Sequence, residues 1–184
     1  MKKYLLCALL FLSSTTSATE QITDSFIIAD KTFEIEPWPL GNPPLESLYT
    51  GDQIHQMLQL DGWCSANWRG YKATWELIDN QLYLTKLVKE ACSENPPIVD
   101  PNLFFGEEKY PVKAAWFSQT IEIRVSKVTT LYCGNNRTIE QSIGESYDAD
   151  VYEFSAGELV SQSTKKIEKL WKRDKQNCEI TKEQ

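Results

Sequence analysis

The chain has 184 residues, of which 26 are acidic and 19 basic, for a formal net charge of −7. An acidic chain repels phosphate groups, so this composition excludes a general nucleic-acid-binding protein. Hydrophobic residues make up 41% of the sequence, and the length is sufficient for one domain with a buried core.

Residues 1–18 have the three parts of a secretory signal peptide. Lys2 and Lys3 form a positively charged start, residues 5–12 are apolar, and Thr16-Ser17-Ala18 is a small-residue cleavage site. The apolar stretch is much shorter than the roughly 20 residues of a membrane-spanning helix. We therefore expect the segment to be removed and the protein to be exported, to a bacterial periplasm or to the medium.

Residues 19–184 are expected to form a single β-rich domain. Removal of the signal peptide also removes two lysines. The remaining chain has 17 basic and 26 acidic residues, so its net charge is −9 instead of −7. No later stretch is apolar over enough residues to predict stable insertion in a membrane.

Removal of Cys7 with the signal peptide leaves four cysteines. An even number of cysteines in an exported chain predicts disulfide bonds. None of the four belongs to a CxxC pair and His55 is the only histidine, so the sequence indicates no zinc site, no thiol oxidoreductase and no cofactor. A turn at Asp79-Asn80 would bring the first two cysteines together at the open end of one hairpin. The predicted pairs are Cys64–Cys92 and Cys133–Cys178.

Alternation of apolar and polar residues predicts a mainly β fold, a single antiparallel meander that forms a barrel-like sheet or a sandwich. The clearest pattern is a hairpin over residues 71–88, with its turn at Asp79-Asn80. The other predicted strands are a pair within 26–35 around Ala29-Asp30-Lys31, a pair at 112–117 and 120–125, a strand at 128–133, and a pair at 149–155 and 158–163 around Ala156-Gly157.

Two helices are expected beside the strands. Asn42-Pro43-Pro44 should begin a short helix that Gly51 ends. Residues 164–176 should form a C-terminal helix, because Ile167, Leu170 and Trp171 would share one of its faces.

The C-terminal segment 163–176 is basic. It holds six basic and two acidic residues, so it carries +4 while the rest of the exported chain carries −13. It either neutralises the acidic body or binds an anionic partner, and we favour the first. The long connection 90–111 is interpreted as a segment pinned to the core by Cys92 and two phenylalanines rather than as a functional loop.

No pattern of catalytic residues is found. The sequence lacks a GxSxG elbow, a phosphate-binding loop, a dinucleotide fingerprint and an HExxH motif. A catalytic nucleophile needs a base positioned beside it, and His55 is the only imidazole available for that role. The pairs Glu107-Glu108 and Asp148/Asp150 leave a hydrolase with two carboxylates as an alternative, but we favour the interpretation that they belong to a solvated acidic surface.

Six tryptophans are the most distinctive feature of the composition. Trp75 and Trp116 lie in alternating strands and are expected in the core, whereas Trp38 and Trp68 lie in connectors and are expected to be more exposed. Arg69 is not required by strand packing, and it would either pair with Glu76 or line a pocket for an anionic group. The candidate ligand- or partner-binding residues are Trp38, Trp68, Arg69, Glu107 and Glu108.

The stretch Trp68-Arg69-Gly70-Tyr71-Lys72-Ala73-Thr74-Trp75-Glu76 resembles a family of small bacterial proteins of uncharacterised activity. Its members share a W-R-G-Y-x-A-T-W-E hairpin, a later W-F strand and an upstream P-L-E segment, which correspond here to Trp116-Phe117 and Pro44-Leu45-Glu46. The resemblance covers roughly residues 43–160. It implies no activity and no catalytic residues.

These features together predict an exported, non-catalytic domain that binds or inhibits another protein, as an immunity or inhibitor protein does. Two alternatives remain. One is a hydrolase of envelope polymers that uses paired carboxylates, and the other is a β-barrel that holds a small ligand.

N-terminal sequencing of the protein recovered from the periplasm or the medium tests the export prediction. The chain should begin at Thr19 or within a few residues of it, because cleavage requires the small residues that precede this position. Exported protein that begins at Met1 would contradict the prediction.

Overall fold

Strands dominate the structure, a computed structural model that describes residues 19–36, 41–60, 64–134, 142–170 and 180–182. In these residues the mainly β prediction is confirmed. The helical segments are η1 (Pro44–Ser47), α1 (Gly51–Leu58) and α2 (Asn102–Phe105). The strands are β1 (Asp24–Ile28), β2 (Lys31–Ile35), β3 (Tyr71–Ile78), β4 (Gln81–Lys89), β5 (Val112–Lys113), β6 (Thr120–Arg124), β7 (Thr129–Cys133), β8 (Ser142–Ser155), β9 (Glu158–Leu170) and β10 (Ile180–Lys182).

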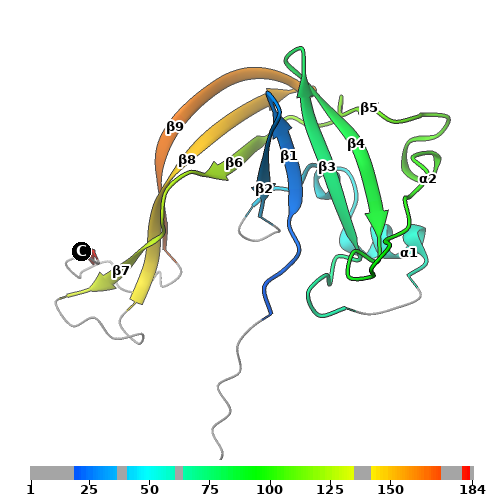
Figure 1. Cartoon of the computed structure of the whole chain (residues 1–184). Helices are drawn as coiled ribbons and strands as arrows, with labels where there is room; N and C mark the ends of the chain where they lie inside the picture. Colours follow the sequence, from blue (N-terminus) through cyan, green and yellow to red (C-terminus); the bar gives the residue numbers. More distant parts are fainter. Residues whose placement is uncertain (1–18, 37–40, 61–63, 135–141, 171–179, 183–184) are drawn as a thin grey trace, which may run out of the picture.

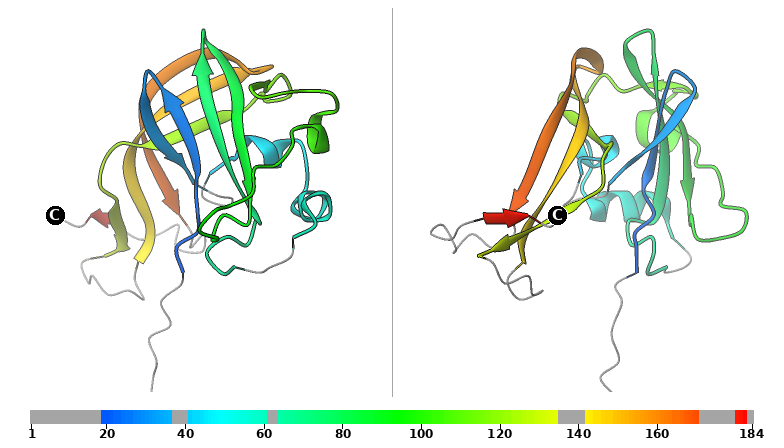
Figure 2. Two further views of the ribbon diagram at one scale, coloured as in Figure 1. Left: turned by 45° about the vertical axis from the view of Figure 1, so that its right-hand side comes forward. Right: turned by 60° about the vertical axis from the view of Figure 1, so that its left-hand side comes forward.

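The strands form one bent sheet with the order β10-β7-β8-β9-β4-β3-β1-β2, to which β5 is added beside β4 and β6 beside β8. The layer of β1 to β4 faces the layer of β6, β8 and β9, and the two join where the β3–β4 and β8–β9 turns meet (Figures 1 and 2). On the opposite side β2 lies near β6, where Arg124 pairs with Glu36 at 2.9 Å. The sheet is therefore barrel-like.

The pairing of β1 with β3 is parallel, so the sheet is mixed where the sequence predicted an antiparallel meander. Parallel neighbours need a long connection, and residues 29–70 supply it, because β2 returns the chain antiparallel to β1 before η1 and α1 follow. The register places Phe26 beside Trp75. This crossover brings the N-terminal strand next to the motif that the sequence singled out.

Three predicted two-residue turns are confirmed. Ala29-Asp30, Asp79-Asn80 and Ala156-Gly157 all have positive φ at both positions, as hairpin turns that match the twist of the strands require. They connect β1 with β2, β3 with β4, and β8 with β9.

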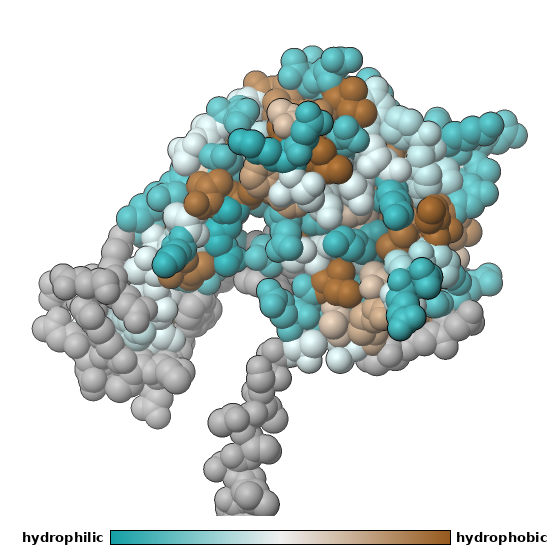
Figure 3. All heavy atoms as spheres, in the orientation of Figure 1, coloured by the Kyte–Doolittle hydropathy of each residue, from teal (hydrophilic) through white to brown (hydrophobic). Residues whose placement is uncertain are grey.

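Aromatic rings fill the space between the two layers of the sheet. Phe26 of β1 contacts Tyr152 of β8 edge to face, with ring centroids 5.5 Å apart, and Phe117 lies 5.6 Å from Phe154. Trp75 is fully buried, as predicted. On the face seen in Figure 3, apolar residues form separate patches among hydrophilic ones, so the apolar area lies mainly between the layers.

The predicted hairpin over residues 112–125 is wrong. Strand β5 ends at Lys113 and pairs with β4, while β6 pairs with β8. The backbone N–H of Phe117 donates to the carbonyl of Ala114, which turns the chain. The turn places Phe117 in the core. The alternation of apolar and polar residues along 112–117 does not predict this turn.

The predicted C-terminal helix is also wrong over its described part, residues 164–170, which continue β9. These residues pair with β8 in a register that sets Lys166 opposite Asp148 and Lys169 opposite Glu145. Ile167 packs on a small second cluster that contains Tyr147. Long-range strand pairing therefore overrides a helical spacing of apolar residues. Residues 171–176 lie outside the described part of the chain.

The basic end of β9 lies against acidic side chains of its neighbours. Lys165 pairs with Glu153 at 3.0 Å, and Lys169 lies 3.8 Å from Glu122 of β6. These contacts support the interpretation that the segment neutralises the acidic body. Exposed pairs of this kind contribute only about 0–1 kcal/mol each.

The helical segments differ in detail from the prediction. Proline begins η1 as expected, but Gly51 begins α1 rather than ending a helix. Thr50 and Gln53 form a capping box, in which each side chain bonds the other's backbone N–H. Among the described residues, no helix is both long and apolar enough to cross a membrane.

The predicted disulfide Cys64–Cys92 is present, with a Cα–Cα distance of 6.5 Å. It fixes the start of the long connection 90–111, which Phe104 pins to the core by burying its ring. The connection therefore packs on the body as the sequence indicated. The other predicted pair cannot be compared, because Cys178 lies outside the described residues.

Replacing both Cys64 and Cys92 by serine should lower the free energy of unfolding. The bond closes a loop with a sequence separation of 28 residues, for which the restriction of the unfolded chain corresponds to about 3–4 kcal/mol. Denaturant unfolding measures the loss, and Ser93→Ala, at a neighbouring exposed position, should change it by less than about 0.5 kcal/mol. A Cys64–Cys133 peptide in a non-reducing digest would contradict the assignment.

Candidate functional site

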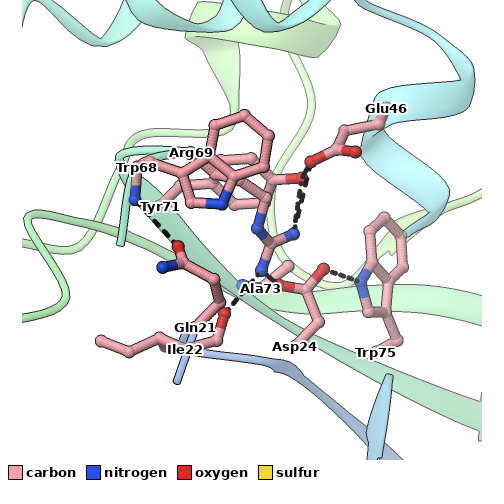
Figure 4. A network of polar contacts seen from close by, with 9 residues as sticks. All are labelled: Gln21, Ile22, Asp24, Glu46, Trp68, Arg69, Tyr71, Ala73 and Trp75. Carbon is pink, nitrogen blue, oxygen red and sulfur yellow. Dashed lines mark hydrogen bonds and ion pairs between the residues drawn. The ribbon is translucent and has the colours of Figure 1, made fainter. Parts of the chain in front are cut away.

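The start of β3 carries a buried ion pair between Arg69 and Asp24. The Nη2 atom of Arg69 lies 2.9 Å from Oδ1 of Asp24, and the two residues are 6% and 0% exposed (Figure 4). The same carboxylate accepts hydrogen bonds from the backbone N–H of Ala73 at 3.0 Å and from Nε1 of Trp75 at 3.2 Å. Three donors from one stretch of chain thus converge on one aspartate of β1.

Alternation along the strand explains this convergence. Side chains two residues apart share a face of a strand, so Tyr71, Ala73 and Trp75 lie on the buried face of β3, and Arg69, two residues before Tyr71, is buried beside them. Gly70 adopts a φ of +79°, and a Cβ atom there would lie 2.2 Å from the side chain of Leu60. Glycine is therefore needed at this position both for the backbone and for the space.

Glu46 of η1 completes the polar network. Its Oε1 accepts from Nη1 of Arg69 at 3.5 Å and from the hydroxyl of Tyr71 at 3.2 Å. Burial raises the pKa of Glu46, and the nearby positive charge of Arg69 opposes that rise only in part. Burial also raises the pKa of Tyr71 well above its usual value. The hydroxyl therefore stays protonated, and it donates a hydrogen bond to Glu46.

Arg69 is held in its charged form by this environment. Burial is the largest single effect and disfavours the charge, but the combined effects of Asp24, Tyr71 and Glu46 exceed it and raise the pKa of Arg69. Nη2 also donates to the carbonyl of Ile22 at 3.1 Å, and Nη1 donates to the hydroxyl of Tyr71 at 3.1 Å. Both terminal nitrogens of the guanidinium are thus bonded to groups of the protein itself.

A pocket of about 480 Å³ opens next to this network. Aromatic and aliphatic side chains form most of its wall, and carboxylates lie among them. The lining residues are Glu46, Tyr49, Thr50, Gly51, Asp52, Ile54, His55, Trp68, Arg69 and Tyr71. The pocket therefore lies between the η1–α1 segment and the beginning of β3.

The predicted site residues do not all come together. Trp68 is 42% exposed, as expected, and lines the pocket with Arg69. Arg69 pairs with Asp24 and Glu46 instead of Glu76. Glu107 and Glu108 are exposed in the connection before β5 and are not among the lining residues. Trp38 lies outside the described residues.

Several residues of the network and of the pocket were not singled out as site residues by the sequence. Asp24 belongs to the buried network and does not line the pocket, and it is brought to the network by the parallel pairing of β1 with β3. Tyr49, Asp52 and His55 reach the pocket because η1 and α1 pack beside the start of β3. The one available signal was Glu46 in the P-L-E segment, which the family resemblance had marked.

The pocket offers aromatic surfaces and carboxylates, and its cation is paired with Asp24. His55 is the one imidazole of the chain, and it lines the same wall as Asp52. Within the described ranges, no group of three histidine, cysteine or acidic side chains is arranged to hold a metal ion.

Replacing Asp24 by alanine should destabilise the fold by about 3–5 kcal/mol, because it leaves a buried guanidinium without its main partner. The donors of Ala73 and Trp75 lose their acceptor in the same variant. Urea unfolding measures the change. Glu34→Ala removes an exposed carboxylate from the adjacent strand β2 and should change stability by about 0.5 kcal/mol or less. Equal effects of the two substitutions would contradict a central role for Asp24.

The three segments that carry the family resemblance meet at this network. Glu46 of the P-L-E segment bonds Arg69 of the hairpin motif, while Nε1 of Trp116 donates to the carbonyl of Pro44 at 3.1 Å. Trp116 also packs edge to face on Trp75, with centroids 6.4 Å apart. Comparison with family models, with curated proteins and with solved structures gave no match.

Proposed function

We propose that this protein is an exported, non-catalytic domain that binds another protein, and that the pocket beside Arg69 receives a side chain of the partner. The observation that carries the proposal is the composition of the pocket wall. Tyr49 and Trp68 present rings there, and Trp68 remains 42% exposed, whereas the ring of Tyr71 behind them is fully buried. Partly exposed tryptophan and tyrosine next to a pocket are typical anchors of protein interfaces.

The surroundings of the pocket support a protein partner. Leu48 follows η1, between two residues of the pocket wall, and is 39% exposed. The elements that form the wall are stabilised by protein contacts. The capping box stabilises the start of α1, and the buried ion pair with Asp24 holds Arg69 in place. A rigid site loses little conformational entropy when it binds, which favours affinity.

The alternative of a ligand inside the barrel has less support. The space between the layers is filled by fully buried side chains, among them Phe26, Trp75 and Phe117. The carboxylate pairs that suggested a hydrolase also have other roles. Asp150 accepts a hydrogen bond from Thr164 at 2.7 Å, and Glu107 and Glu108 lie on the exposed surface.

Export is part of the proposal and is supported by the disulfide. Disulfide bonds persist in the periplasm and outside the cell, whereas the cytosol keeps thiols reduced. Cys64 and Cys92 form such a bond, and the sequence of residues 1–18 has the pattern of a signal peptide.

Site-specific photo-crosslinking tests the binding proposal. Leu48 is replaced by p-benzoylphenylalanine in the exported protein, and the same replacement at Val160, which is 59% exposed on β9, serves as the control. One protein should be captured from position 48 and not from position 160. With that protein purified, Trp68→Ala should weaken binding at least about tenfold.

The outcome that contradicts the proposal is equally specific. The same proteins captured from both positions would show that position 48 is not part of a specific interface. Unchanged affinity of a folded Trp68→Ala variant would show that the pocket does not anchor the partner. Because Trp68 is largely outside the core, circular dichroism of this variant should match that of the original protein.

A further inference from the structure

The charges around the pocket beside Arg69 are unbalanced. Two carboxylates, Glu46 and Asp52, line it together with one cation, Arg69. That cation lies 2.9 Å from Asp24, which is fully buried and already balances it. A group that enters the pocket therefore meets uncompensated negative charge.

Glu46 has capacity for a further donor. Both of its hydrogen bonds end on Oε1, so Oε2 accepts none from the residues that the structure describes. Its side chain is 21% exposed, which leaves it accessible from the pocket. Burial raises its pKa, which means that its charged form lacks solvation that a cation would supply.

The aromatic rings of the pocket wall can contact both the methylene groups and the charged group of a basic side chain. Lysine and arginine pack their methylene groups along apolar surface while the charge stays near polar groups. Aromatic faces attract cations, and tryptophan does so most strongly. Trp68 and Tyr49 provide such surface next to the two carboxylates.

We propose that the group seated in this pocket is the ammonium or guanidinium of a lysine or arginine on the partner protein, held by Glu46 and Asp52 with its stem against Trp68. This inference rests on the proposed function and names the chemistry of the partner. An anionic group is disfavoured, because both terminal nitrogens of Arg69 already donate to protein groups, Nη2 to Asp24 and the carbonyl of Ile22, and Nη1 to Tyr71 and Glu46.

Blocked amino acids test the selectivity without the partner. The probes are the Nα-acetyl methylamides of lysine, arginine, norleucine and glutamate, titrated into isotopically labelled protein. The reporter is the NMR signal of the Trp68 indole, assigned with Trp68→Phe. The lysine and arginine probes should shift this signal and bind at least about fivefold more tightly than norleucine, which has the same stem without the charge.

Charge-removing variants locate the effect. Glu46→Gln keeps an oxygen acceptor for Arg69 and Tyr71 but removes the charge, and Asp52→Asn does the same at the second carboxylate. Each should reduce the preference for lysine over norleucine about threefold or more. The matched control is Glu158→Gln, because Glu158 is an exposed carboxylate at the opposite end of the β3–β4 hairpin. It should leave the preference unchanged.

The acid dependence of binding gives a second readout. Glu46 faces Arg69, Tyr71 and Asp24, and it shares the pocket with Asp52 and His55. A cation favours the ionised form of Glu46, so affinity for the lysine probe should fall as pH decreases through the raised pKa of this group. Glu46→Gln should weaken that dependence. The variant His55→Gln shows how much of the pH dependence of affinity comes from the imidazole rather than from Glu46.

The results distinguish the two proposals. Equal binding of norleucine and lysine, or tighter binding of glutamate, overturns the cation inference even if crosslinking at position 48 succeeds. Lysine selectivity without a specific crosslink overturns the protein-binding proposal and leaves a pocket for cations. Selectivity that survives both Glu46→Gln and Asp52→Asn overturns the assignment of these carboxylates.

Discussion

The buried pair of Asp24 and Arg69 is the interaction on which the arrangement of the site depends. A carboxylate removed from water requires donors, and Asp24 finds them in Arg69, in the backbone of Ala73 and in the indole of Trp75. These donors come from one short stretch of chain, residues 69–75, at the start of β3 and just before it. A shift of one residue between β1 and β3 would turn the aspartate to the other face of the sheet, so the pair favours a single register.

A buried ion pair adds little net stability, because the loss of hydration offsets much of the Coulombic attraction. Its effect here is positional. Arg69 is fixed by Asp24 on one side and by Tyr71 and Glu46 on the other, and Glu46 belongs to η1. The pair thus connects the N-terminal strand, the central hairpin and the helical crossover, and the last two of these form the wall of the pocket.

This arrangement separates two roles within one short motif. Arg69, Tyr71 and Trp75 face inward and hold the fold together, whereas Trp68, one residue before the ion pair, remains partly exposed. The partner-binding surface that we propose is therefore built directly on the most constrained part of the structure. Such support keeps the pocket wall in place without a ligand, which is the condition for selective recognition of a single charged side chain.

The sequence by itself determined the local features of this protein. Paired turn residues such as Asp79-Asn80, the alternation along β3 and β4, and the Cys64–Cys92 disulfide depend on neighbours in the chain or on one hairpin, and all three were predicted. The exposure of Trp68 was also predicted, since it lies outside a strand.

Tertiary structure alone decided the rest. Residues 164–170 became strand because β8 offered a long pairing partner, and Asp24 entered the site because a crossover of more than thirty residues placed β1 beside β3. Such contacts join positions far apart in the chain, and their stability comes from burial and pairing that no local pattern encodes.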